Sequence, residues 1–197
     1  LYHKTTGNNN TALGQGSLND LVSGNLNLAV GSSSGSLLTS GNNNIMIGTN
    51  AQVPSNTGSN QVRLGNTDIT YAGMQVAWTV TSDRNLKSNI LNSNLGLGFI
   101  TKLRPVCYTR KNDESGKTEY GLIAQEVEEV LQQEGAENTG MLTVTESGEY
   151  QLRYNDLLAP MIKAIQELNE KNDNLSAENT DLKARLEKYE QTQNILA

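Results

Sequence analysis

The sequence predicts an α+β protein in three parts that assembles as a trimer. Residues 1–77 are expected to form stacked β-coils of the β-roll or β-solenoid kind, residues 78–154 a small mixed α/β domain, and residues 155–197 a long coiled-coil helix. Three observations lead there: a Gly/Asn-rich repeat of constant step, an ordinary mixed composition in the middle, and a charged, glycine-free heptad pattern at the end. A constant step predicts stacked coils, and sustained heptads predict a coiled coil.

The repeat occurs four times, as "GNNNTALG", "GNLNLAVG", "GNNNIMIG" and "GSNQVRLG", with 17 residues from each start to the next. Period-2 alternation bounded by Gly/Asn turns predicts one short strand per copy. Low complexity alone, as in a disordered linker, would not keep apolar residues in phase. We therefore expect the apolar residues before each closing glycine to line up as a buried column: Leu13, Val30, Ile47 and Leu64. Since apolar positions are few per coil, the coils should also pack against partner chains.

The last part follows a heptad repeat for more than five heptads. The a positions are Leu158, Ile165, Asn172, Asn179, Leu186 and Gln193. The d positions are Met161, Leu168, Leu175, Leu182, Tyr189 and Leu196. This narrow stripe favours a coiled coil over the alternative, an amphipathic helix packed on its own domain.

Several other residues of the helix have predicted roles. Asn172 and Asn179 are polar a positions, which fix register and strand number at some cost in stability. Asn155 or Asp156 is expected to cap the start of the helix. Pro160 is expected in the first turn, where proline is best tolerated.

Composition limits the possible function classes. The chain of 197 residues has 36% hydrophobic and only 5% aromatic residues, which makes a large monomer core hard to build. Its net charge of −6 gives no general attraction to nucleic acid or anionic membranes. Cys107 is the only cysteine, so we expect no internal disulfide and no cysteine-based metal site. We expect no cofactor either. No apolar run of membrane-spanning length and no signal peptide are visible, and Leu1 indicates a piece of a longer chain.

The middle part reads as a short helical region followed by two hairpins and a helix. "SDRNLKSNI" leads towards "LGLGFITKL", and "NDESG" is a turn between two strand patterns. "AQEVEEVLQQ" has a helix pattern with Val127, Val130 and Leu131 on one face. A second hairpin is expected around Ser147 and Gly148.

The segment "SDRNLK" has two interpretations. In the first, Ser82 or Asp83 caps a helix and Lys87 is a solvated residue paired with Asp83 at i,i+4. In the second, Ser82 is a nucleophile and Lys87 its base. His3 and Cys107 leave neither a Ser-His-Asp triad nor a Cys-His pair in this domain, so lysine is the remaining candidate base.

A lysine acts as a base only where burial favours its neutral amine. Five residues along an α-helix place two side chains roughly 140° apart. If Ser82 and Lys87 meet, Ser82 must therefore lie in an extended segment just before a helix that starts at Asp83. From residue chemistry alone, both interpretations of the segment remain open.

Four motifs occur in a fixed order: "SDRNLKSNI", "LRPVCYTRK", "YGLIAQEVEEVL" and "YNDLLAPMIKAIQEL". Together they resemble the C-terminal intramolecular chaperone domain of phage tailspikes and tail fibres, the self-cleaving endosialidase chaperone type. The resemblance spans about residues 78–170, and it is similar in kind to the cleavage domain of the myelin regulatory factor transcription factors. The family's usual proline soon after "AQEV" is absent, which affects the loop after that helix rather than "SDRNLK".

The resemblance implies a specific chemistry. Family members trimerise, assist the folding of a β-structured fibre and then cut themselves just before a serine. In this chain the scissile bond would join Thr81 and Ser82, with Ser82 as nucleophile and Lys87 as general base. Asp83 would have at most a supporting role, capping the helix or orienting Lys87, and "YGLIAQEV" would serve core and trimer packing.

The resemblance also implies partners and a location. We expect a homotrimer whose client is the upstream fibre of the same chain, and a mature fibre that binds a host-cell surface receptor. No nucleic acid partner and no membrane insertion are expected. The fibre would fold in the host cytoplasm and reach the virion, and the chaperone fragment would be released.

Two other functions compete with this one. A non-enzymatic trimeric adhesin or fibre stalk would use "SDRNLK" only as a helix cap. A membrane-tethered transcription factor would need a basic DNA-binding zone upstream, where this chain has Gly/Asn repeats.

Overall fold

The computed structural model describes residues 6–137 and 139–196, so His3 lies outside the described residues. The chain forms two compact units. The first contains the chain up to Asp83 together with Val106–Ala124 and Leu142–Leu152. The second contains Arg84–Pro105, Gln125–Met141 and the chain from Arg153 onward. This division follows contacts within one chain, whereas the three predicted parts follow composition.

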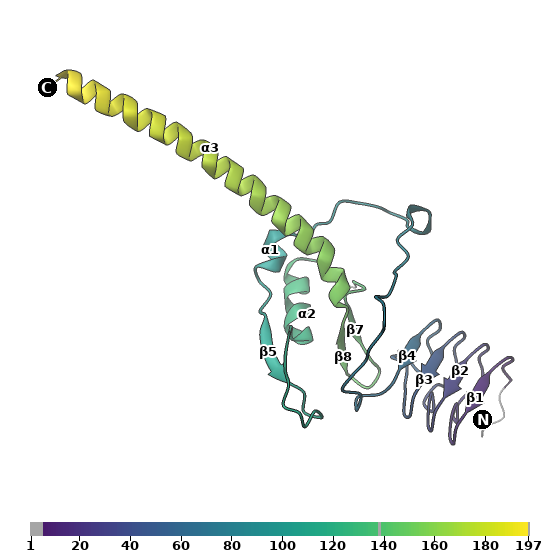
Figure 1. The fold of residues 1–197 in the computed structure, drawn as a ribbon. Helices are drawn as coiled ribbons and strands as arrows, with labels where there is room; N and C mark the ends of the chain where they lie inside the picture. Colours follow the sequence, from purple (N-terminus) through teal and green to yellow (C-terminus); the bar gives the residue numbers. More distant parts are fainter. Residues whose placement is uncertain (1–5, 138, 197) are drawn as a thin grey trace. The chain divides into compact units, whose positions relative to one another are not determined.

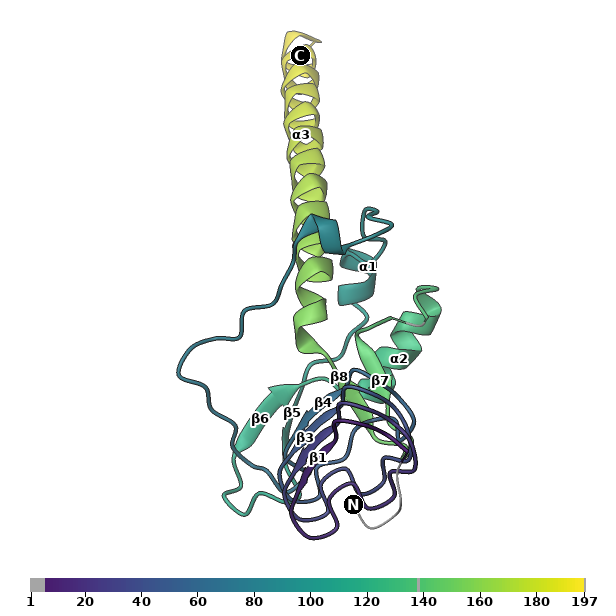
Figure 2. The same ribbon diagram turned by 90° about the vertical axis from the view of Figure 1, so that its right-hand side faces the viewer.

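The Gly/Asn repeat forms a stack of coils in the first unit. Its strands are β1 (Thr11–Leu13), β2 (Leu28–Val30), β3 (Ile45–Ile47) and β4 (Val62–Leu64). They form one parallel sheet in chain order, and each residue pairs with its equivalent in the next repeat (Figures 1 and 2). The strands therefore lie where the period-2 alternation predicted them.

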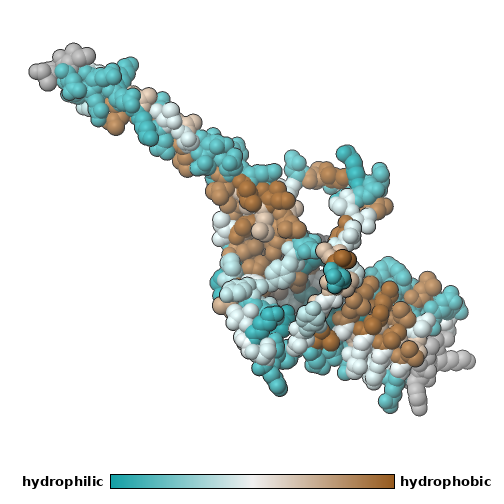
Figure 3. Space-filling model, in the orientation of Figure 1, coloured by the Kyte–Doolittle hydropathy of each residue, from teal (hydrophilic) through white to brown (hydrophobic). Residues whose placement is uncertain are grey.

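The residues buried inside the coils differ from those that the sequence analysis predicted. Its core consists of Leu18, Leu21, Ala29, Leu38, Met46, Ala51 and Val53. The expected buried column was wrong, because Leu13, Ile47 and Leu64 are 66%, 42% and 58% exposed. A strand turns alternate residues to opposite faces, and here the middle residue of the strand and the loop leucines face inward. The in-phase apolar residues line up on the outer face of the sheet, which shows brown in Figure 3.

A ladder of side-chain amides joins successive coils. The side-chain oxygens of Asn10, Asn27 and Asn44 each accept the backbone N–H of the residue 17 positions later at 3.0 Å. Asn27 and Asn44 are buried and also donate to the carbonyls of Gly41 and Gly58 at 2.9 Å. The ladder satisfies backbone groups that the three-residue strands leave unpaired.

Close contact between coils explains one of the repeated glycines. Gly41 has a φ of 108°, and a Cβ there would lie 2.1 Å from the Gly58 carbonyl oxygen. No side chain fits at that distance, so the coil spacing requires glycine at this position.

The middle of the chain contains two antiparallel hairpins and a helix. β5 (Val106–Thr109) pairs with β6 (Thr118–Gly121), and β7 (Leu142–Val144) pairs with β8 (Tyr150–Leu152). α2 (Ala124–Gln133) buries one face. That face consists of Val127, Val130 and Leu131. Both predicted hairpins and the predicted helix face are confirmed.

The short helix expected in this region is divided into two pieces, and neither starts at Asp83. The structure has a single 3-10 turn, η1 (Arg84–Leu86), and a separate four-residue α1 (Leu97–Ile100). None of the η1 residues is buried. Without an apolar face to pack, a turn of this length has nothing that stabilises its extension into an α-helix.

The C-terminal helix begins after a second 3-10 turn, η2 (Tyr154–Leu157), and runs as α3 (Leu158–Leu196) for 39 residues. Pro160 lies in its first turn, as predicted. The predicted cap was wrong, because Asn155 and Asp156 lie inside η2, which starts after Arg153 without a side-chain cap.

The heptad stripe of α3 faces away from the helix's own unit. Leu157 and Ala164 are buried, and this start of the helix packs against α1. The described a and d leucines, isoleucine, methionine and tyrosine are exposed: Leu158, Met161, Ile165, Leu168, Leu175, Leu182, Leu186 and Tyr189. The single chain therefore does not use its heptad stripe to pack on its own domain.

Candidate functional site

The predicted cleavage motif lies in an exposed, irregular stretch. Thr81, Ser82 and Asp83 belong to no helix or strand and are exposed. They come directly before η1, after which the Lys87 backbone N–H donates to the Arg84 carbonyl at 3.1 Å. Ser82 therefore precedes a 3-10 turn and Lys87 follows it, whereas the sequence expectation placed Lys87 within a helix that starts at Asp83.

Each predicted catalytic residue is exposed in the single chain. Ser82 and Asp83 end a segment of the first unit, and Lys87 belongs to the second. The Lys87 side chain is exposed on the surface of the single chain. A role as base therefore requires burial that the single chain does not supply.

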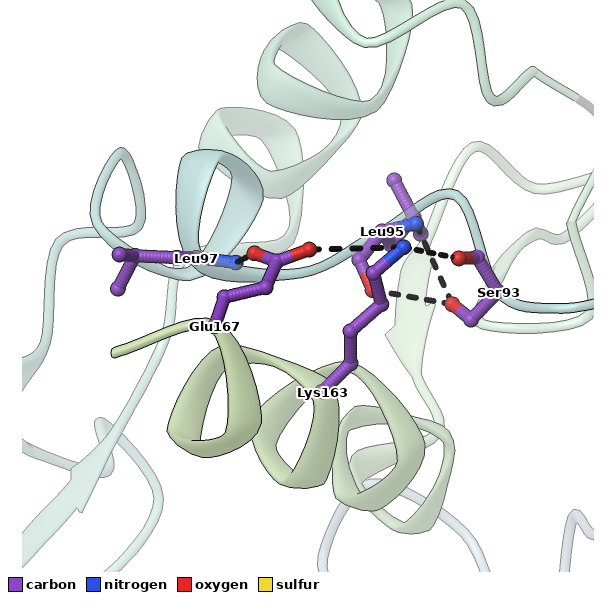
Figure 4. Close-up of polar contacts among 5 residues, drawn as sticks. All are labelled: Ser93, Leu95, Leu97, Lys163 and Glu167. Atoms are coloured by element: carbon purple, nitrogen blue, oxygen red, sulfur yellow. Dashed lines mark hydrogen bonds and ion pairs between the residues drawn. The ribbon is translucent and has the colours of Figure 1, made fainter. Parts of the chain in front are cut away.

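The loop after this motif is fastened to α3 by a set of polar contacts (Figure 4). The Glu167 carboxylate accepts the backbone N–H of Leu97 at 2.7 Å. The Lys163 ammonium donates to the Ser93 carbonyl at 2.5 Å and pairs with Glu167 at 3.5 Å. The Ser93 hydroxyl accepts the Leu95 N–H at 3.2 Å, which holds the loop in a turn. We call these contacts the loop clasp.

The contacts of the loop clasp favour the ionised form of Glu167. The backbone N–H of Leu97, followed by the Lys163 ammonium, lowers the pKa of the Glu167 carboxyl below its ordinary value. Close approach depends on Gly96, because a Cβ there would lie 2.5 Å from a Glu167 carboxylate oxygen. Lys163 and Glu167 occupy heptad positions f and c, so the clasp leaves the a/d stripe uncovered.

Ion pairs also join two of the motifs in the second unit. Arg104, from "LRPVCYTRK", binds Glu126, from "YGLIAQEVEEVL", through both carboxylate oxygens. The guanidinium hydrogen bond lowers the pKa of Glu126. Lys102 pairs with Glu134 at 2.6 Å. These contacts give Glu126 a structural partner.

Sequence reasoning missed the loop clasp. The i,i+4 spacing of Lys163 and Glu167 was visible, and such a pair usually reads as a solvated helix face. Their partners Ser93 and Leu97 lie 70 residues earlier. No local pattern in the sequence connects the two segments.

Across residues 6–137 and 139–196, no cluster of three or more His, Cys, Asp or Glu side chains is arranged to hold a metal ion. Within that same part of the chain, no helix is both long and apolar enough to cross a membrane. Cys107, the cysteine singled out from the sequence, is exposed.

Residues 82–136 match the model of the family Peptidase_S74, described as chaperone of endosialidase. The match begins at Ser82, contains Lys87 and ends after α2, so it covers less of the chain than the predicted resemblance over 78–170. It supports a chaperone role for this part of the chain. A comparison with curated proteins finds no match.

Proposed function

We propose that this chain is the C-terminal part of a phage tail fibre or tailspike, with a trimeric intramolecular chaperone that releases itself by cleavage between Thr81 and Ser82. The observation that carries the proposal is the start of the family match at Ser82. A segment that begins at this residue is what a cut before Ser82 would leave as the chaperone fragment. The coils upstream are the client, and the released fibre is a virion component that binds a host-cell surface.

The proposed reaction uses two side chains. The neutral amine of Lys87 takes the proton of the Ser82 hydroxyl, and the oxygen attacks the carbonyl carbon of Thr81. The peptide C–N bond breaks as the amino group of Ser82 receives that proton, which leaves an ester between the two residues. Water then hydrolyses the ester to give the Thr81 carboxylate and the Ser82 hydroxyl. Asp83 supports the turn between the two residues.

Assembly supplies the burial that the mechanism needs. The exposed heptad stripe of α3 and the exposed outer face of β1–β4 both present apolar side chains that a single chain leaves in water. Three chains packed through these surfaces would remove water from the segment around Lys87. The coiled coil also aligns the three sheets, whose pairing is slow to find without such help.

The decisive experiment is intact mass measurement of the purified, folded protein after denaturation. The parent chain should give two pieces, residues 1–81 and 82–197, without added protease. Ser82→Ala should remain whole and still assemble, because the exposed hydroxyl is no packing element. Ser88→Ala is the matched control, an exposed serine in the same motif, and should cut like the parent.

The competing function is a non-enzymatic trimeric adhesin or fibre stalk. It predicts an assembled parent chain that stays whole under all folding conditions. That outcome, or a new N-terminus other than Ser82, would overturn the cleavage proposal.

A further inference from the structure

The segment just before the proposed scissile bond has a row of apolar side chains that are exposed to solvent. Every second residue of Met74–Val80, here called the junction segment, is large and apolar. These residues are Met74, Val76, Trp78 and Val80, and they are 60–73% exposed. Gln75, Ala77 and Thr79 between them are polar or small. This alternation is typical of a strand that buries one face.

The backbone of the segment is equally without partners in the single chain. Residues 70–81 form no helix or strand, and none of the backbone hydrogen bonds of the described residues involves them. Val76, Thr79 and Val80 are β-branched and favour strands. The segment therefore has a strand-like sequence and open hydrogen-bonding groups along both sides.

The absence of charged side chains around the junction segment is compatible with packing against identical copies. From Ile69 to Ser82 the chain has no charged side chain. Identical copies of this stretch can lie side by side without the repulsion that like charges cause. The heptad pattern of α3, with polar a positions that fix register, predicts a parallel assembly in which equal residues lie at the same level. In such an assembly the same segment of another copy lies at the same level along the chain and is available as its partner.

We propose that the junction segments of three copies pack around a common axis, with Met74, Val76, Trp78 and Val80 facing inward. This inference rests on the trimer of the proposed function and adds the surface that joins the copies upstream of the cut. Because Val80 is separated from Ser82 only by Thr81, the partner chains hold the scissile bond in place. Cleavage then depends on this packing as well as on the helix α3.

Trp78 is the only tryptophan of the chain, so its fluorescence reports on this segment alone. In the assembled full-length protein its emission should shift to shorter wavelength and resist an aqueous quencher. The variant Leu175→Asp, with a charge in the heptad stripe, should stay unassembled and show the emission of exposed indole. Exposed Trp78 in the trimer, or buried Trp78 in the unassembled variant, would overturn the proposal.

Cysteine cross-linking tests which face points inward. Val76→Cys and Ala77→Cys are matched neighbours of opposite parity, introduced with Cys107→Ser and with Ser82→Ala to keep the chain whole. Mild oxidation should link Val76→Cys chains into dimers, up to two of the three chains per trimer, because inward residues come within disulfide distance. Ala77→Cys should give little linkage. Equal linkage at both positions, or none at Val76→Cys, would overturn the inward row.

The two proposals fail separately. Cleavage is measured on the Cys107→Ser chain with Ser82 intact. If the chain cuts itself but Val76→Cys does not cross-link, the proposed function stands and the junction packing is contradicted. If Val76→Cys cross-links into dimers but the chain with Ser82 intact is not cut, the junction packing stands and the cleavage proposal is contradicted.

Discussion

The carboxylate of Glu167 accepts the backbone N–H of Leu97 at 2.7 Å, which ties the long helix to the loop after the Ser82–Lys87 motif. The bond lowers the pKa of Glu167 in the folded chain. Since the ionised form is the one stabilised, the clasp contributes its stability above the ordinary glutamate range. That contribution is lost as pH falls through the lowered pKa.

Glu167→Gln should therefore be less stable than the parent chain at neutral pH, and the difference should vanish in acid. The amide oxygen still accepts the Leu97 N–H but no longer carries charge. Thermal unfolding from pH 7 to below about pH 4 measures the difference. Glu170→Gln, one helical turn further on, is the control and should follow the parent. A difference between Glu167→Gln and the parent that persists in acid contradicts this account.

Met46→Ala should destabilise the coils by about 2–5 kcal/mol, because it removes a fully buried side chain and leaves a cavity. Ile47→Ala, the neighbour on the outer face, should cost less within the coil itself. Denaturant unfolding of both variants in the Leu175→Asp background, where partner chains are absent, compares the two faces directly. Equal losses would mean that the assigned inward face is wrong.

Asn44→Ala should cost about 1–3 kcal/mol, because the backbone N–H of Gln61 loses its acceptor inside the stack. Asn42→Ala is the matched control: its side-chain oxygen also accepts a backbone N–H of a neighbouring coil, that of Asn25, 17 residues earlier, but in an exposed position. Water replaces that exposed bond, so the control should stay close to the parent. Denaturant unfolding of both variants in the Leu175→Asp background measures the difference. If Asn44→Ala does not change the free energy of unfolding, the ladder has no stabilising role.

Leu175→Asp should abolish assembly, because it places a charge in the predicted seam of α3. Ala177→Asp, on the opposite heptad position f, should assemble like the parent. Sedimentation should give three chains per particle for the parent and the control, and one for Leu175→Asp. The unassembled variant should also remain uncut at residue 81. A parent that sediments as a monomer or dimer would remove the basis of the mechanism.

Lys87→Ala should stay whole after folding, since no other base is assigned to Ser82. Lys87→Arg should also stay whole, because a guanidinium remains protonated and cannot accept the serine proton. Lys102→Ala, a lysine paired with Glu134 elsewhere in the matched segment, serves as the control and should cut. Mass spectrometry of each folded product checks the set. Normal cutting by Lys87→Arg would exclude lysine as the base.

Local patterns in the sequence predicted much of the fold. The four coil strands, both hairpins, α2 and the long helix follow from alternation, turn residues and heptads, which are features of neighbouring residues. The inward face of the coils was predicted wrongly, because strands such as "IMI" are apolar on both faces. One face fills the coil and the other lies on its surface, and alternation alone does not distinguish them.

The candidate site was less accessible to sequence reasoning. Chemistry and resemblance pointed to Ser82 and Lys87, and the structure adds that both are exposed around a single 3-10 turn. The helix expected there depended on a capping pattern, and packing did not support it. The loop clasp and the amide ladder join residues far apart in the chain, so they became visible only in three dimensions.

The amide ladder also determines how the height of the stack can change. Each layer repeats the same bonds at the same interval of 17 residues. Inserting or deleting one whole repeat would give every ladder residue an equivalent neighbour and change the height by one strand spacing, about 4.8 Å. The length of the stack can therefore change in equal steps of one repeat, without any change in the sequence from residue 78 onward.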